Sequence, residues 1–267
     1  MIVRKQQDGS LILVNQTDHA KLSAQFAAHW GNEVFATLRP RESMIRAAMF
    51  HDFGWNRYES APIYEPATKT APTFFEVPNS DAQLTEFGNA IHWMMNIDEY
   101  AGLLISRHRT GLWRQRYGLI RQPTPLNKAI VEPQVQAFIA KFEAEQDAFM
   151  GKYDRHEFLT NYQLLQFLDV FSLAFCVREF AGAIFDPVPL GYGDTSKTVQ
   201  IDMSVRSDGA VVAAPYPFDK TELRFSYVFR HLPCSDFASE EVFREAYFGA
   251  PLQLKEIAFV APATRPA

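Results

Sequence analysis

The pattern of apolar residues changes once along this chain, near Asp186-Pro187, and that change constrains the fold more than any other feature. Upstream of this pair, apolar residues recur at helical spacing between capping residues and helix-ending prolines. Downstream, the pattern becomes typical of strands, in segments such as VQIDMSVRSDGAVVAAPYPF and ELRFSYVFRHL. We therefore predict a helical domain over residues 17–187 and β elements over residues 188–267.

The first residues of the chain also predict β-structure. Ile2-Val3 and Leu11–Val14 are β-prone, and Asp8-Gly9 between them is a strong turn dipeptide. We expect this hairpin, within residues 1–16, to pack with the C-terminal strands as one small sheet on the helical body. The predicted fold class is therefore mainly α, with a small β-sheet built from the N-terminal hairpin and the C-terminal strands.

Capping residues and prolines divide the helical body into separate helices. Ser80 and Asp154 are favoured N-cap residues, Pro40 is placed to open a helix, and Gly31 is placed to end one. The longest and most apolar helix follows Asp154. The predicted helices span about residues 17–28, 40–54, 80–96, 98–107, 134–150 and 154–185.

The composition excludes several classes of protein. With 47% hydrophobic residues, the 267-residue chain is not intrinsically disordered, and a formal net charge of −5 argues against general nucleic-acid binding. Two cysteines, Cys176 and Cys234, cannot form a disulfide framework or a four-cysteine zinc site. The opening residues lack the apolar stretch of a secretory signal, and no run of about 18 apolar residues follows. We expect a cytoplasmic protein with no membrane partner, and the sequence leaves homo-oligomer formation open.

Asp169 is the most unusual polar residue, because its surroundings, YQLLQFLDVFSLAFCV, are among the most apolar in the chain. A helix that is apolar on all sides is buried, and an isolated buried carboxylate is very costly. Helical spacing places Tyr162, Gln166 and Cys176 near the same stripe. Two interpretations of Asp169 are open at this point. An ion pair with an arginine of a neighbouring helix is slightly favoured over a role as a metal ligand.

Histidines provide further candidates. The adjacent pair His51-Asp52 supplies an imidazole nitrogen and a carboxylate oxygen to one point, which suits a divalent metal. His19 lies in the first turn of the first long helix, and His108 lies on the apolar side of its own helix. His92 lies on the flank of the preceding helix. Taken singly, each of these residues is typical of a surface, capping or core histidine.

The order of these residues is more informative than any one of them. His19, His51-Asp52, His108 and Asp169 follow one another on a predicted helical body, and this order resembles the HD-domain superfamily of metal-dependent phosphohydrolases. The segments HDFGW, DEYAGLLISRH and NYQLLQFLDVFSL are similar to an uncharacterised bacterial HD-like family of similar length, whose members also begin with a short β segment. The resemblance extends over most of the chain.

The resemblance implies a helical HD fold that binds one or two divalent ions, of Fe, Mn, Zn, Ni or Mg. The first ion would have four ligands: His19, His51, Asp52 and Asp169. For a second ion, His108 is the stronger candidate and His92 the weaker one. The implied activity is hydrolysis of a phosphate ester, in a nucleotide or another small phosphorylated metabolite, by a metal-activated water.

An arginine-rich segment begins next to His108. Residues 107–121 contain five arginines and no acidic residue, and arginine is suited to bidentate phosphate contacts. Arg109 is the strongest single candidate for a phosphate contact, although a solvated basic face or a set of ion pairs explains the segment equally well. The predicted catalytic residues are therefore Asp52, His108 and Arg109. With only one ion bound, His108 would act as a general acid or hold a phosphate oxygen.

Residues 56–80 contain four prolines and no helical period, which predicts a long loop. Because this loop directly follows His51-Asp52, we expect it to roof the cleft. Phe74 and Phe75 would be its apolar anchors, and Glu76 would face the site.

Two other functions are open. A non-catalytic sensor or scaffold with the same fold would bind a metal or ligand without turnover. A di-iron oxygenase is less favoured and would use the same ligands for two irons. Metal analysis and assays on phosphate esters distinguish these two functions from the hydrolase.

Overall fold

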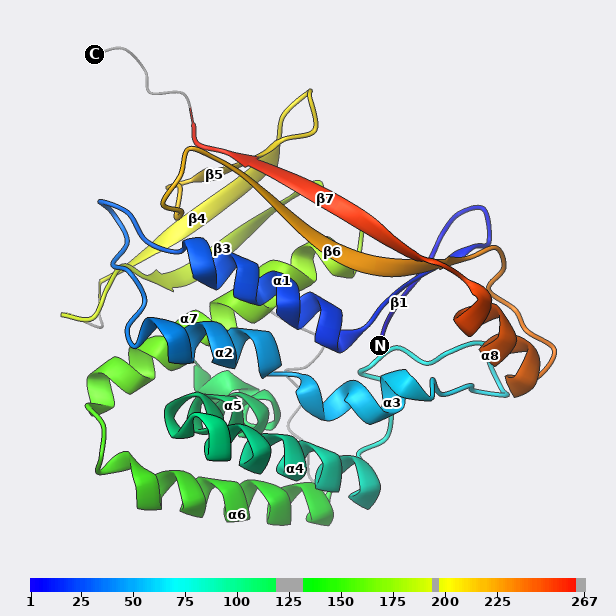
Figure 1. Ribbon diagram of the computed structural model, residues 1–267, viewed down its shortest axis with the longest axis horizontal. Coiled ribbons are helices and arrows are strands. Elements are labelled where there is room, and N and C mark those ends of the chain that lie inside the picture. Colours follow the sequence, from blue (N-terminus) through cyan, green and yellow to red (C-terminus); the bar gives the residue numbers. More distant parts are fainter. Residues whose placement is uncertain (119–131, 194–196, 263–267) are drawn as a thin grey trace.

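The computed structural model describes residues 1–118, 132–193 and 197–262. In this part of the chain, helices cover one face of a curled seven-stranded sheet (Figure 1). The strands are β1 (Ile2–Lys5), β2 (Leu11–Val14), β3 (Gly182–Pro189), β4 (Thr198–Val205), β5 (Val211–Ala214), β6 (Glu222–Leu232) and β7 (Leu252–Val260). Their order in the sheet is β1-β2-β6-β7-β5-β4-β3. The sheet is mixed, because β5 and β7 pair in parallel while the other neighbours pair antiparallel.

The helices begin largely where their capping residues predict. Ser80 accepts a hydrogen bond from the Gln83 N–H at 3.3 Å, and Asp154 accepts one from the Glu157 N–H at 2.7 Å. A short 3₁₀ turn, Phe53–Trp55, follows α2 in the chain, and a left-handed turn, Gln115–Gly118, follows α5. The α-helices are α1 (Gln16–His29), α2 (Arg41–Phe50), α3 (Asn56–Ser60), α4 (Asp81–Ile97), α5 (Glu99–Trp113), α6 (Pro133–Met150), α7 (Arg155–Cys176) and α8 (Glu240–Gly249).

The predicted fold class, mainly α with a small sheet, is wrong, because the seven-stranded sheet is a major element of the fold. One reason is that α7 ends at Cys176 rather than near Phe185, so β3 begins before the point at which the sequence predicted β-structure. A short apolar run does not by itself distinguish a buried helix from a buried strand. Gly182, with φ at +132°, adopts a backbone conformation that no helix contains.

Both predicted hairpins form. At the first turn, Gly9 has φ at +84° and the Asp8 carboxylate accepts a hydrogen bond from the Ser10 N–H at 2.9 Å. Gly209, also with φ at +84°, closes the hairpin between β4 and β5. The first hairpin joins the C-terminal strands, because β2 pairs with β6. The sequence did not predict α8, which Ser239 caps by accepting from the Val242 N–H.

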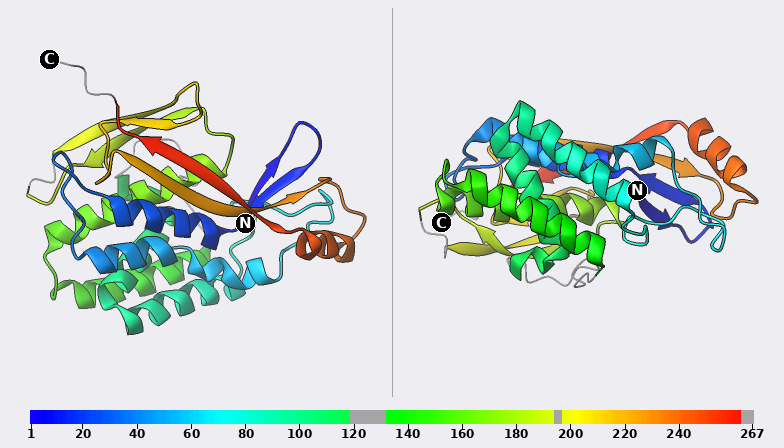
Figure 2. Two further views of the ribbon diagram at one scale, coloured as in Figure 1. Left: turned by 45° about the horizontal axis from the view of Figure 1, so that its top comes forward. Right: turned by 90° about the horizontal axis from the view of Figure 1, so that it is seen from below.

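Phenylalanines fill the space between the sheet and the two nearest helices. The ring of Phe26 on α1 lies 4.7 Å, centroid to centroid, from Phe171 on α7 and 4.7 Å from Phe225 on β6. Phe259 on β7 completes this cluster. Figure 2 shows the helical layer from below, with α4 and α6 on the side away from the sheet. The aromatic cluster therefore sets the positions of α1 and α7 relative to the sheet and to each other.

Candidate functional site

Four polar residues predicted from the sequence come together inside the helical layer. His19 comes from α1, His51 and Asp52 from the end of α2, and Asp169 from α7, and all four are buried. The His19 Nε2 atom lies 2.9 Å from Asp52 Oδ2, and His51 Nε2 lies 3.5 Å from Asp169 Oδ1. Ligand atoms of His19, His51 and Asp169 all lie within 4.8 Å of one another, a spacing that one metal ion can bridge.

Neighbouring groups fix how the first two histidines are oriented. The His51 Nδ1–H donates to the backbone carbonyl of Ala48 at 2.8 Å. His19 Nδ1 lies 2.9 Å from Ser172 Oγ. Because the Ser172 hydroxyl donates its own proton to the Asp169 carbonyl, its oxygen accepts from His19 Nδ1–H. Metal-ligating histidines commonly donate their second ring N–H in this way.

Both imidazoles therefore direct Nε2 toward carboxylate oxygens. The buried Nε2 atom of His51 has no hydrogen-bond partner among the described residues. Its nearest carboxylate oxygens are Asp169 Oδ1 at 3.5 Å and Asp52 Oδ2 at 3.7 Å, at and beyond the limit of hydrogen-bond distance. A buried polar atom without a partner is costly. A cation between these nitrogen and oxygen atoms would remove that cost, so the residues present fit a metal ion.

The charges of the cluster are strongly coupled. Burial by itself would raise the pKa of both carboxyl groups, but His51 and Arg109 hold the pKa of Asp52 well below its usual range. Arg116 and His51 do the same for the pKa of Asp169. Burial would lower the pKa of His51, but the two carboxylates outweigh it and raise that pKa above its ordinary value. Both aspartates are therefore ionised at neutral pH, the state that binds a cation.

Asp169 forms the ion pair with an arginine that the sequence suggested, but through only one of its two carboxylate oxygens. Arg116 Nη2 lies 2.9 Å from Asp169 Oδ2, and the arginine is only 1% exposed. Residues 115–117 have φ values of 51° to 54°, so a left-handed turn after α5 brings this side chain into the core. Asp169 Oδ1 remains directed at His51. The ion pair and the proposed metal site therefore use different atoms.

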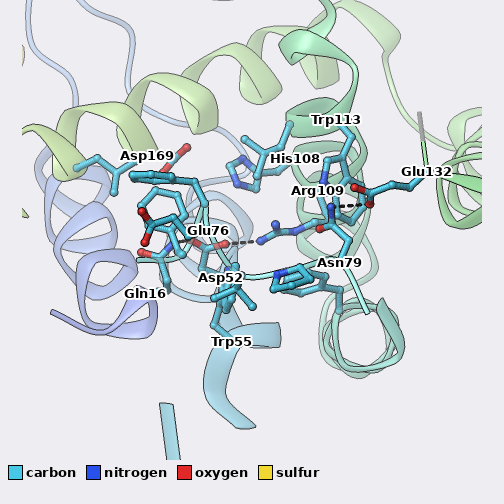
Figure 3. A pocket seen from close by; sticks show the side chains of 17 residues that line it. Gln16, Asp52, Trp55, Glu76, Asn79, His108, Arg109, Trp113, Glu132 and Asp169 are labelled. Atoms are coloured by element: carbon cyan, nitrogen blue, oxygen red, sulfur yellow. Dashed lines mark hydrogen bonds and ion pairs between the residues drawn. The ribbon is translucent and has the colours of Figure 1, made fainter. Parts of the chain in front are cut away.

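A cleft of about 450 Å³ opens next to the cluster. Asp52, His108, Arg109 and Asp169 contribute to its lining (Figure 3). Its remaining lining is largely aromatic, amide or apolar: Gln16, Trp55, Phe74, Phe75, Glu76, Val77, Pro78, Asn79, Phe87, Leu112, Trp113, Glu132 and Leu173. Aromatic walls are less polar than water, which strengthens the electrostatic interactions of the charged groups beside them.

The proline-rich loop lines this cleft, as the sequence predicted. Phe74, Phe75 and Glu76 all contribute to the lining. Phe74 also packs against the hydrophobic core, whereas Phe75 is 52% exposed and does not anchor the loop. The Glu76 carboxylate accepts a hydrogen bond from the Thr73 N–H at 2.9 Å. The first part of the predicted loop forms α3, where Glu59 accepts hydrogen bonds from the start of α1.

His108 and Arg109 on α5 both reach the cleft. His108 is buried, and its burial lowers its pKa well below the ordinary value. Arg109 Nη2 lies 2.5 Å from Asp52 Oδ1, and its guanidinium carbon lies 3.9 Å from the centre of the Phe87 ring. Figure 3 shows the Arg109 side chain directed at Asp52.

The structure does not bring His92 into the cluster, unlike the other predicted metal ligands. Its side chain is 45% exposed, and its Nε2 pairs with Glu145 on α6 at 2.8 Å. This contact directs the His92 side chain toward α6. Within the basic segment, Arg114 pairs with Glu143, and Arg121 lies outside the described residues.

Sequence reasoning missed several polar groups that hold the cluster in place. Gln16 donates from Nε2 to Asp52 Oδ2 at 3.3 Å, and its buried Oε1 has no hydrogen-bond partner among the described residues. Ser172 orients His19, and Arg116 pairs with Asp169. No local signal marks these residues, because their partners are far away in the sequence.

The fold and site define a mixed α/β protein with a buried centre of histidine and aspartate at the end of an aromatic cleft. A family described as a protein of unknown function, DUF3891, matches residues 1–234. The chain therefore belongs to the DUF3891 family. The predicted membership of the HD-domain superfamily is wrong, because the matching family is a different one and the large sheet is not part of a helical HD fold.

No curated protein and no solved structure gives a significant match to the chain. Helix α8 and the central strand β7 follow the matched residues. Among the helices of the described residues, none has the length and apolar character needed to cross a membrane.

Proposed function

We propose that this protein is a metal-dependent hydrolase of a phosphate ester, with a nucleotide or another small phosphorylated metabolite as substrate. The observation that carries the proposal is one cleft that combines two features. Asp52 and Asp169 line the cleft and contact the buried nitrogens of His19 and His51, and Arg109 and His108 line the same cleft beside them. The first feature fits a cation, and the second fits the anion on which it would act.

Four side chains would hold the ion: His19, His51, Asp52 and Asp169. Two imidazole nitrogens together with carboxylate oxygens suit Fe, Mn, Zn or Ni better than Mg, which prefers oxygen ligands alone. A divalent ion bound there would supply an activated water and polarise a phosphoryl oxygen. Arg116 would keep its bond to Asp169 Oδ2 and so hold this carboxylate in place.

Arg109 would bind the substrate phosphate. Its hydrogen bond to Asp52 uses one of its five N–H donors, and Arg109 donates no other hydrogen bond to the described residues. Contact with the Phe87 ring and the bond to Asp52 hold the guanidinium in position before substrate arrives. A positioned arginine supports phosphoryl transfer by stabilising the charge on the equatorial oxygens.

A comparison of two histidine variants tests the proposal. His51→Ala removes a proposed ligand, whereas His92→Ala changes a histidine that pairs with Glu145 outside the cluster. Each purified protein is stripped with chelator, reloaded with Mn²⁺ or Zn²⁺, and analysed for bound metal. The same samples are assayed on p-nitrophenyl phosphate, nucleotides and sugar phosphates. We expect the wild type and His92→Ala to bind metal and hydrolyse at least one ester, and His51→Ala to lose both properties.

Three results would contradict the proposal. Equal metal content in His51→Ala and the wild type would exclude the metal site. Metal binding without turnover on any ester would favour a non-catalytic binding protein. Two bound irons with a redox-dependent absorption spectrum would favour a di-iron oxygenase.

A further inference from the structure

His108 differs from the other two buried histidines in the partner of its Nδ1 atom. His19 Nδ1 and His51 Nδ1 face oxygen acceptors and therefore carry protons. His108 Nδ1 instead lies 2.8 Å from the side-chain nitrogen of Gln166. An amide NH₂ group can only donate, so His108 Nδ1 must present a lone pair.

The orientation of the Gln166 amide is itself determined by Arg116. The Arg116 Nη1 group donates to Gln166 Oε1. If the amide were reversed, two N–H donors would face each other in a buried site. Two hydrogen bonds therefore connect Arg116 through Gln166 to His108. Because a guanidinium can only donate, the Gln166 oxygen accepts from Arg116 and the Gln166 NH₂ group donates to His108. Since Nδ1 has no proton, the proton of the neutral His108 ring is on Nε2.

We propose that Gln166 is a positioning residue that holds His108 with its proton on Nε2, so that His108 donates a hydrogen bond to the bound anion and does not ligate a second metal ion. The anion-binding part rests on the proposed function, whereas the tautomer does not. A second group of possible metal ligands, His51, Asp52 and His108, has suitable spacing. A nitrogen that carries a proton cannot bind a metal. With its proton on Nε2, His108 cannot act as the third ligand of this second group, so the centre holds one ion.

NMR of the wild-type protein tests the tautomer directly. Long-range ¹H–¹⁵N spectra of histidine-labelled protein, assigned with the single histidine variants, show which ring nitrogen carries the proton. We expect the proton of His108 on Nε2 in both the metal-free and the Zn²⁺-loaded protein, and Zn²⁺-induced changes at His19 and His51. A proton on His108 Nδ1 in either state would overturn the proposal.

Metal stoichiometry gives a second, independent readout. The wild type and His108→Ala should each bind one Zn²⁺ per chain, with affinities within about threefold of each other. Binding of two Zn²⁺ ions by the wild type, with the second lost in His108→Ala, would overturn the proposal. If the metal site of the proposed function is wrong, the wild type binds no Zn²⁺, and if only the hydrolase activity is wrong, Zn²⁺ binds without ester turnover. In both cases the tautomer of the metal-free protein still decides the role of Gln166.

Gln166→Glu reverses the hydrogen bond, because a carboxylate only accepts and would draw the proton of His108 to Nδ1. The matched control is Gln163→Glu on the same helix, outside the cleft lining. We expect the tautomer to reverse in Gln166→Glu alone, and its affinity for inorganic phosphate to fall about tenfold, as for one lost hydrogen bond. An unchanged tautomer in Gln166→Glu would contradict the assigned role, and so would the same phosphate loss in Gln163→Glu.

Discussion

Helices α1 and α7 each contribute residues to two buried clusters, one polar and one aromatic. On α7, Asp169 and Phe171 are two residues apart and so stand on roughly opposite faces. On α1, His19 lies about two turns before Phe26. His19 and Asp169 belong to the polar centre, whereas the two phenylalanines pack beneath the sheet.

Burial of the two clusters contributes differently to the free energy of folding. Burying phenylalanine stabilises the fold directly, by about 1.5–3 kcal/mol for each side chain. Burying aspartate is costly unless a counter-charge accompanies it, and a buried ion pair rarely adds net stability. We infer that the aromatic cluster maintains the fold, while the polar centre is retained for its chemistry. Substitutions in the two clusters should therefore affect different properties.

Asp169→Asn should have the largest effect, because this residue serves both the ion pair and the proposed metal site. Removal of its charge leaves Arg116 buried without a counter-charge, which costs about 3–5 kcal/mol of unfolding free energy. Metal affinity should fall by more than about 100-fold, since loss of even an outer hydrogen-bond partner costs 10–100-fold. Urea denaturation and metal analysis measure the two effects. Asp147→Asn on the exposed side of α6 is the control, and full metal occupancy of Asp169→Asn would count against the metal site.

Phe171→Ala should reduce stability without changing the site. Its ring is fully buried among other phenylalanines, so its removal should cost about 3–5 kcal/mol by urea denaturation. Metal stoichiometry of the folded protein should stay the same. Val177→Ala, at a position that is 41% exposed, should change stability by less than about 0.5 kcal/mol. If Phe171→Ala does not fold, Phe171→Leu gives a smaller loss. A large change in metal affinity in either variant would show that the two clusters are coupled.

Ser172→Ala tests the orientation of His19. The variant removes the acceptor for His19 Nδ1–H and should weaken metal binding about 10–100-fold. Ser106→Ala is the matched control, because Ser106 is also buried and hydrogen-bonded, but to Gln146 on α6. Isothermal titration with Zn²⁺ measures both affinities. Similar affinities in the two variants would mean that Ser172 contributes only to packing.

The pH dependence of stability should be the smallest effect. The carboxylates of Asp52 and Asp169 raise the pKa of His51 above 6.5 despite its burial. The stabilisation from this group is therefore complete below pH 6.5 and is lost as the pH rises through the folded-state pKa. Thermal unfolding in chelator, between about pH 6 and 9, should show this decline in the wild type and a flatter profile in His51→Ala. A decline of equal size in both proteins would assign it to another group.

Local signals predicted most of the helices and both hairpins. Ser80 and Asp154 cap their helices because a capping side chain bonds to backbone only three residues away. The end of α7 and the whole of α8 were not predicted. The run before Phe185 suits a helix or a strand equally well, and pairing with β4 decides between the two.

The sequence also placed most of the candidate site residues, but not their partners. His19, His51, Asp52 and Asp169 were named as one ligand set from the resemblance of their order to the HD-domain superfamily, to which the chain does not belong, and the structure nevertheless brings them together. Arg116 and Gln166 were not assigned roles, because their bonds reach Asp169 and His108 across 53 and 58 positions. Composition and periodicity contain no information about such pairs.

By itself, the sequence determined where most of the helices begin, where two hairpins turn, and that Asp169 is buried, because backbone geometry and hydrophobic patterning act over a few residues. Only the tertiary structure decided that Asp169 meets both Arg116 and His51, and which ring nitrogen of His19 and of His51 faces a carboxylate. The physical reason is that charge pairs and hydrogen bonds act over a few ångströms. Their partners are therefore set by how α1, α5 and α7 pack together beneath the sheet.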